Sequence, residues 1–159
     1  MGYQHAPQRR DESLQPLSRD HYQGLVHAEH LRKSGLEDGD ASSRQKALSE
    51  FVEGWDNEIA DHFAEEERLL IELMTEEETN ELYAQHRNLR SLADEAKTRQ
   101  TWDDPGADWC RSLGEALRDH IRWEERTLFP AVQGRATPEQ LEALAEHTAP
   151  IEQRRGRCR

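Results

Sequence analysis

The chain has 159 residues, of which 33 are acidic and 21 are basic, and its net charge is −12. This length fits one domain with a modest core, and the acidic balance disfavours nucleic acids and anionic membranes as partners. No apolar stretch approaches the ~18 residues that a membrane-spanning helix requires. Because Cys110 and Cys158 form no close pair, we expect the protein to lie in a reducing cytoplasm. Because residues 1–16 are polar, we expect no secretory signal.

Few aliphatic residues and a high net charge also fit a disordered chain, but apolar residues recur at helical spacing after residue 16. Residues 1–16 predict a disordered arm. Helices are expected at about 18–34, 44–73, 76–97, from Pro105 to the region of Pro130, and, as a short fifth helix, 138–148. Ser18, either Ser42 or Ser43, and Thr75 with Glu78 are the expected N-caps. Residues 149–159 predict a frayed tail.

No segment alternates as a strand would. Four long amphipathic helices with short connections predict an all-α, up-down-up-down four-helix bundle with a short fifth C-terminal helix. The domain is expected to span residues 17–148.

The inner faces of these helices carry ionisable side chains where apolar ones are expected, and burying them unpaired would be costly. Each long helix supplies a histidine, and the second and fourth add a glutamate four residues later, about 40° around the same helix face. Counting residues from the helix ends brings the histidines to a similar height. The six residues are His21, His62, Glu66, His86, His120 and Glu124.

The segments HFAEEERLL and HIRWEERTL, which begin at His62 and His120, echo each other. The chain therefore reads as two helical hairpins, each with one lone histidine and one H-x-x-x-E pair, which predicts a two-metal site. Imidazole and carboxylate donors without thiolate suit iron, manganese or zinc, and bundle-core dinuclear sites favour iron or manganese. The alternative is a set of core histidines paired with glutamate.

From about Ser18 to Gln140 the chain resembles the hemerythrin-like, or HHE cation-binding, family. The resemblance is carried by SRDHYQGLVHAEHLR, HFAEEERLL, QHRNLRSL and HIRWEERTLFP, followed by a TPEQLEAL helix. It implies a four-helix bundle that holds two non-haem iron ions with an oxo or hydroxo bridge. By this resemblance His21 and His62 serve one iron, His86 and His120 serve the other, and Glu66 and Glu124 bridge.

The chain departs from the oxygen-carrying hemerythrins at Arg90, where they have a further histidine ligand. This difference favours turnover or sensing over reversible oxygen carriage. Glu58 and Tyr83 are candidate substitute ligands or outer hydrogen-bond partners, Tyr22 is a weaker candidate, and Arg90 either donates hydrogen bonds to a bound ligand or faces solvent.

Other polar residues are expected to lie off the inner faces. His27 and His30 are expected to point away from the inner face of their helix and could form a surface metal site. Glu65, Glu67 and Glu125 are expected on a solvated face, although Glu65 could support His62.

Three functions remain open from the sequence. The leading one is a di-iron protein that reacts with or senses dioxygen, peroxide or nitric oxide, with a small diatomic or peroxide ligand and an unidentified protein partner. The second is iron binding or buffering without turnover, and the third is a metal-free helical interaction module. Whether the protein is an enzyme stays open.

Overall fold

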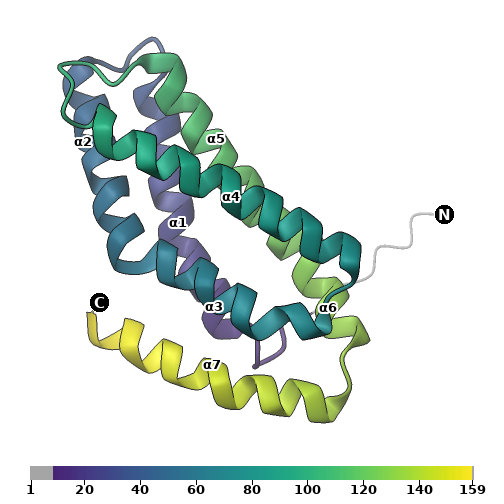
Figure 1. Cartoon of the computed structure of the whole chain (residues 1–159). Helices are drawn as coiled ribbons and strands as arrows, with labels where there is room; N and C mark the ends of the chain where they lie inside the picture. Colours follow the sequence, from purple (N-terminus) through teal and green to yellow (C-terminus); the bar gives the residue numbers. More distant parts are fainter. Residues whose placement is uncertain (1–8, 159) are drawn as a thin grey trace.

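A computed structural model describes residues 9–158, with side chains for residues 9–154 (Figure 1). This part of the chain is helical and contains no strand. Two of its segments are single π-helical turns, η1 and η3, and η2 is a 3-10 turn. The elements are α1 Gln15–Ser34, α2 Ala41–Gly54, η1 Trp55–Ile59, α3 Ala60–Leu70, η2 Ile71–Leu73, α4 Glu76–Arg99, α5 Ala107–Trp123, η3 Glu124–Leu128, α6 Phe129–Arg135 and α7 Pro138–Cys158.

Of the three predicted N-caps, two are wrong and one is confirmed, and the helix expected from Pro105 begins two residues later, at Ala107. Helix α4 begins with the predicted capping box, in which the backbone N–H of Glu78 donates to Thr75 Oγ1 at 3.1 Å. Helix α2 is capped by Asp40, because the Asp40 carboxylate accepts from the backbone N–H of Ser43 at 2.7 Å. Helix α1 starts before Ser18, since Pro16 fits its first turn, where no backbone N–H is needed.

Both ends of the described chain differ from the expected arm and tail. Residues 1–8 of the predicted arm lie outside the described residues, but Leu14 is completely buried and Gln15 already belongs to α1. The fifth helix does not end near residue 148: α7 continues through Pro150 to Cys158. The buried side chain of Ile151 extends its apolar contact with the core.

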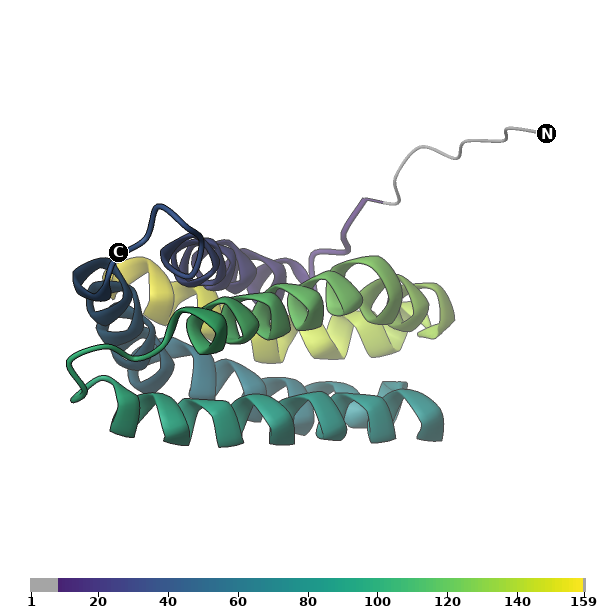
Figure 2. The same ribbon diagram turned by 90° about the horizontal axis from the view of Figure 1, so that it is seen from above.

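The long helical segments lie side by side (Figures 1 and 2). Helix α1 packs against α5 and α2, and α4 packs against α2 and α5. Helix α7 lies across one end of this group and contacts α1.

The core consists of two hydrophobic clusters with a polar layer between them. On α1, Leu17 belongs to the cluster near α7, and Leu31 belongs to the other cluster. The order is the same on α4, where Leu82 and Leu89 lie in different clusters. On both helices the lone histidine, His21 on α1 and His86 on α4, lies in the sequence between the two leucines. The predicted ionisable positions therefore form the boundary between the two clusters.

Gly114 allows a close approach between α1 and α5. A Cβ atom at this position would lie 2.5 Å from the carbonyl oxygen of Ala28 and 2.8 Å from the backbone nitrogen of Arg32. We therefore expect Gly114→Ala to lower the free energy of unfolding by about 1–3 kcal/mol in urea denaturation. The matched control is Gly134→Ala, which meets no atom within 4 Å and should be neutral or stabilising by up to about 1 kcal/mol. Equal effects of the two substitutions would contradict this packing.

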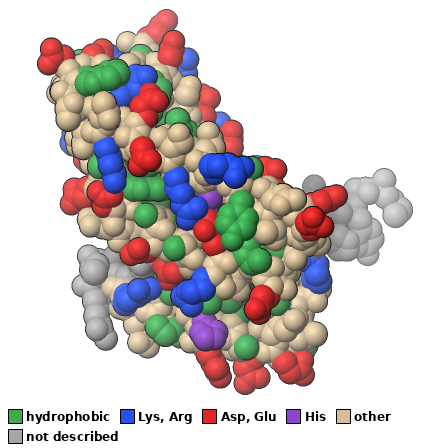
Figure 3. Space-filling view, viewed as in Figure 1, with side chains coloured by type: hydrophobic (Ala, Val, Ile, Leu, Met, Phe, Trp, Pro, Cys, Tyr) green, Lys and Arg blue, Asp and Glu red, His purple; other side chains and the backbone are tan. Residues whose placement is uncertain are grey.

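The surface carries charges of both signs. On the face drawn in Figure 3, acidic and basic side chains are interspersed with hydrophobic ones. Within the described part of the chain, none of the helices is long and apolar enough to cross a membrane.

Candidate metal centre

The six ionisable residues predicted for the inner faces meet in the polar layer. All six side chains are buried. Their donor atoms form two overlapping groups, and within each group the atoms lie within 4.8 Å of one another. Both groups contain Glu66 and Glu124. One group adds His21 and His62, and the other adds His86 and His120.

Each of the two shared glutamates lies between histidines of two helices. The Glu66 carboxylate is 3.2 Å from His62 Nε2 on its own helix and 3.2 Å from His86 Nε2 on α4. The Glu124 carboxylate is 3.5 Å from His120 Nε2 and 2.8 Å from His21 Nε2 on α1. Every imidazole therefore turns its Nε2 atom toward a carboxylate that a second imidazole also approaches.

In each of these four histidines, the other ring nitrogen, Nδ1, is hydrogen-bonded to a side chain outside the layer. The Nδ1–H groups donate to four different side chains: His21 to Glu125 at 2.6 Å, His62 to Asp20 at 3.0 Å, His86 to Glu67 at 2.6 Å and His120 to Gln85 at 2.7 Å. Such bonds fix the tautomer and the orientation of an imidazole, and they leave Nε2 as the inward-facing donor atom.

The sequence interpretation missed these four outer partners. Glu67 and Glu125 were expected on a solvated face, and this is wrong, because each binds a histidine on another helix. Each outer partner is the sequence neighbour of a predicted ligand. The signal that could have found them is a repeated pattern: Asp or Gln directly before a lone histidine, and Glu directly after the glutamate of each H-x-x-x-E pair.

The four further candidates do not join the two groups. Tyr22 and Tyr83 are 72% and 41% exposed, unlike the six buried side chains of the layer. The guanidinium of Arg90 donates to Glu67 at 2.8 Å and 3.2 Å, and thus supports the carboxylate that holds His86. Glu58 lies in π-turn η1, where it lines a cavity beside the layer. Glu65 was expected on a solvated face or as a support for His62; the solvated face is wrong, because Glu65 is buried and binds Arg154 of α7 at 3.0 Å.

Burial and mutual contact shift the pKa values of this layer in opposite directions. Burial alone would lower the pKa of His21, but its hydrogen bonds to Glu124 and Glu125 raise that pKa to about 9. Burial would also lower the pKa of His62, but the charge of Glu66 and the hydrogen bond to Asp20 raise it. Burial lowers the pKa of His120 to about 4. The pKa of Glu66 is depressed: burial opposes this shift, and the charge of His62 outweighs it.

Several inward-facing atoms of the layer lack a hydrogen-bond partner. His62 Nε2, Glu66 Oε2, His120 Nε2 and Glu124 Oε2 are buried without one, although His62 Nε2 and Glu66 Oε2 lie only 3.2 Å apart. Unpaired buried polar atoms are costly and need an explanation. Four imidazole nitrogens and two shared carboxylates supply lone pairs directed at common points, so the residues fit a pair of metal ions.

Aromatic and aliphatic side chains enclose the layer. The ring of Phe63 stacks on His86 with centroids 3.9 Å apart, and Phe129 stacks on His21 at 5.5 Å. Beside the layer lies a cavity of about 20 Å³, room for about one water-sized molecule. Its apolar lining comes from Phe63, Leu117 and Ile121, among others, and the imidazoles of His21, His62 and His120 border it.

The possible surface metal site finds no support in the described residues. His30 Nδ1 lies 3.5 Å from Glu50, and His27 packs against Gly54. Neither histidine joins a group of three potential ligands within residues 9–154.

The chain is similar to a known domain family and to part of a curated protein. The model of the hemerythrin HHE cation-binding domain matches residues 17–132, well over half of the chain. Among curated proteins, a DNA nickase of Nostoc sp. (strain PCC 7120 / SAG 25.82 / UTEX 2576) is 33% identical over 70 residues, which cover 44% of this chain and 20% of that protein. The match thus spans about a fifth of the relative. No solved structure matches the chain.

Proposed function

Because the chain belongs to the hemerythrin HHE cation-binding domain family, we propose that its polar layer holds two iron ions and that the loaded protein reacts with or senses dioxygen, peroxide or nitric oxide. The observation that carries this proposal is the orientation of the four imidazoles. Their Nδ1 atoms are held by outer partners, and their Nε2 atoms converge on two shared glutamates.

Each residue of the layer has a distinct part in the proposed centre. His21 and His62 would hold one ion, His86 and His120 would hold the other, and Glu66 and Glu124, which belong to both groups, would serve both. Iron, when bound, supplies the electron-transfer chemistry that dioxygen, peroxide and nitric oxide require.

The surrounding side chains prepare the layer for a small reactant. Phe63 and Phe129 fix the imidazole planes and exclude water. The apolar cavity next to His21, His62 and His120 accepts a molecule of about the size of water. This cavity favours a reaction with a small molecule over iron buffering without turnover.

The proposal includes an up-down-up-down arrangement of the long helices as a four-helix bundle. The packing of α1 with α5 and α2, and of α4 with α2 and α5, supports it. A cytoplasmic location is part of the proposal, as is a protein partner of unknown identity. DNA is not among the proposed partners, because the net charge of −12 opposes binding to phosphates and the nickase shares only a fifth of its length with this chain.

Turnover distinguishes the proposed function from iron buffering. Supplied with an excess of a chemical reductant such as ascorbate, the iron-loaded protein should consume many equivalents of peroxide, dioxygen or nitric oxide per centre, measured with electrodes against the metal-free protein, whereas iron buffering would consume no more than the electrons stored in the reduced iron. Because position 90 supplies an arginine bound to Glu67 and no imidazole, oxygenation should yield a ferric product, and the dioxygen should not be released intact. Clean recovery of the reduced spectrum after oxygen is removed would instead indicate reversible carriage.

The outer partners should affect metal affinity without unfolding the chain. Glu67→Ala removes the acceptor for His86 Nδ1, so we expect metal affinity to fall about 10–100-fold, a typical effect of losing such a partner. Competition titration with a chromophoric chelator measures the affinity. Glu77→Ala, at an exposed position of the first turn of α4, is the control. Equal affinities of the two variants would show that Glu67 does not support the centre.

A further inference from the structure

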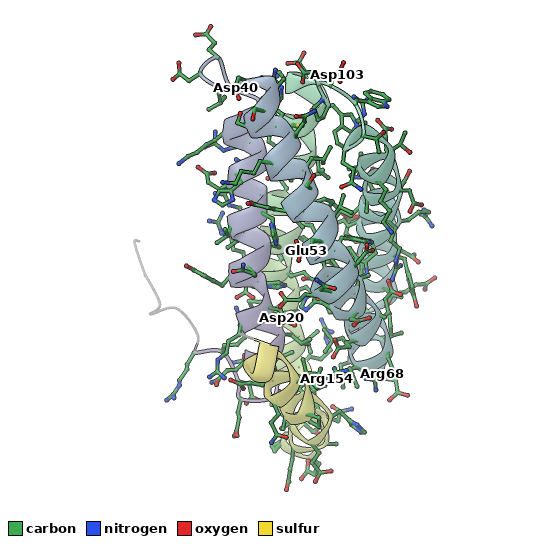
Figure 4. All side chains as sticks on the ribbon, turned by 90° about the vertical axis from the view of Figure 1, so that its left-hand side faces the viewer. Asp20, Asp40, Glu53, Arg68, Asp103 and Arg154 are labelled. Atoms are coloured by element: carbon green, nitrogen blue, oxygen red, sulfur yellow. The ribbon has the colours of Figure 1, made fainter. Side chains whose placement is uncertain are left out.

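Two of the outer partners occupy equivalent places in the two helical hairpins but differ in charge. Asp20 and Gln85 each directly precede the lone histidine of their helix. Each accepts from the Nδ1–H of the histidine in the neighbouring H-x-x-x-E pair, Asp20 from His62 at 3.0 Å and Gln85 from His120 at 2.7 Å. Figure 4 shows Asp20 on α1 beside the ribbon of α3, which carries His62. One position thus has a carboxylate where the other has a neutral amide.

The remaining two outer partners match each other. Glu125 and Glu67 each accept from the Nδ1–H of a lone histidine at 2.6 Å. An arginine also binds each of these carboxylates, Arg10 at 3.2 Å and Arg90 at 2.8 Å. The two halves of the layer are therefore alike in ligands, shared carboxylates and these outer ion pairs, and the exchange of Asp20 for Gln85 distinguishes them.

We infer that Asp20 and Gln85 make the two metal positions unequal, so that the position beside His62 takes up a divalent cation before the position beside His120. This inference rests on the proposed function in that it requires two metal positions. It does not depend on what the loaded centre reacts with.

The direction follows from the charge of the partner. A carboxylate that accepts from Nδ1–H makes the imidazole a stronger donor at Nε2, and its negative charge in a buried setting attracts a cation. The amide oxygen of Gln85 also accepts from the Nδ1–H of His120, but it adds no charge. Outer partners of this kind typically change metal affinity about 10–100-fold, enough to separate the two binding steps.

Zinc titration of the metal-free, full-length protein tests the order of filling. Zn²⁺ is diamagnetic and binds histidine and carboxylate ligands, so the ring nitrogen signals of each histidine can be followed by ¹⁵N NMR. At sub-stoichiometric Zn²⁺ and at a pH above 9, where protons no longer compete for His21, the signals of His21 and His62 should change before those of His86 and His120.

Isosteric substitutions should reverse this order. Asp20→Asn keeps an acceptor for His62 but removes the charge. Gln85→Glu adds a charge beside His120, and Glu81→Gln is combined with it, because the Gln85 amide donates to Glu81 at 2.7 Å. The combined change exchanges an amide and a carboxylate one helical turn apart and keeps the net charge. Glu81→Gln alone is the control, and it should leave the wild-type order intact.

The expected result is that His86 and His120 respond first in the triple variant Asp20→Asn, Gln85→Glu, Glu81→Gln, and that Asp20→Asn alone narrows the gap between the two steps. A merely structural role of Asp20 and Gln85 would not reverse the order. Simultaneous filling of both positions in the wild type, or an order that these substitutions leave unchanged, would overturn the inference. A protein that fills in the expected order but consumes neither peroxide, dioxygen nor nitric oxide would contradict only the proposed function.

Discussion

Glu66→Ala should remove both metal ions from the protein, whereas His86→Ala should remove only one. The Glu66 carboxylate belongs to both groups of potential ligands, but His86 belongs to one. Loss of Glu66 therefore takes a ligand from each position and the bridge between them. The metal content per chain after anaerobic iron loading, measured by mass spectrometry, should fall from two to near zero in Glu66→Ala.

Glu66→Ala should still fold without metal. The charge of Glu66 is the main influence that raises the pKa of His62, so without Glu66 we expect His62 to lose its proton and not to remain as an unpaired buried charge. The neighbouring variant Glu65→Gln is a matched control, because Glu65 is buried but binds Arg154 of α7. Circular dichroism verifies folding. Retention of two ions in Glu66→Ala would refute the shared-ligand assignment.

Removal of the metal should lower the melting temperature by about 8–16 °C. A ligand present at about 1,000 times its dissociation constant stabilises the folded state by about 4 kcal/mol, and each kcal/mol shifts the melting temperature of a chain of this size by about 2–4 °C. Differential scanning calorimetry before and after chelation measures the shift. An unchanged melting temperature after verified metal removal would favour the metal-free interaction module.

The melting temperature of the metal-free protein should depend on pH. With its folded-state pKa raised from 6.5 to about 9, His21 stabilises the metal-free fold fully below pH 6.5, and this contribution is lost as the pH rises through 9. Metal ions also compete better when His21 is neutral. The difference between the metal-bound and metal-free melting temperatures should therefore widen from pH 6.5 to 9. A constant difference over this range would contradict the raised pKa of His21.

The ligands of the layer could be predicted from the sequence because helical periodicity fixes which side chains share a face. His62 and Glu66 are four residues apart, and their facing atoms lie 3.2 Å apart in the structure. The similar height of the histidines also followed from counting residues to the helix ends. The predicted meeting of the six side chains is confirmed, although their binding of iron stays a prediction.

The outer partners could not be assigned from one helix at a time. Glu67 follows Glu66 directly, but it serves His86 on another helix. Such contacts depend on how far neighbouring helices are rotated, and the π-turns η1 and η3 change this rotation. The extension of α7 was missed for a related reason: residues 149–159 were expected to fray, but burial of Ile151 against the core favours helix.

The most direct test of the account is anomalous diffraction at the iron absorption edge from crystals of the iron-loaded protein. The account predicts two iron peaks between Glu66 and Glu124, one bound by His21 and His62 and the other by His86 and His120. Iron peaks elsewhere, or no peak in this layer in a protein with verified iron content, would contradict it.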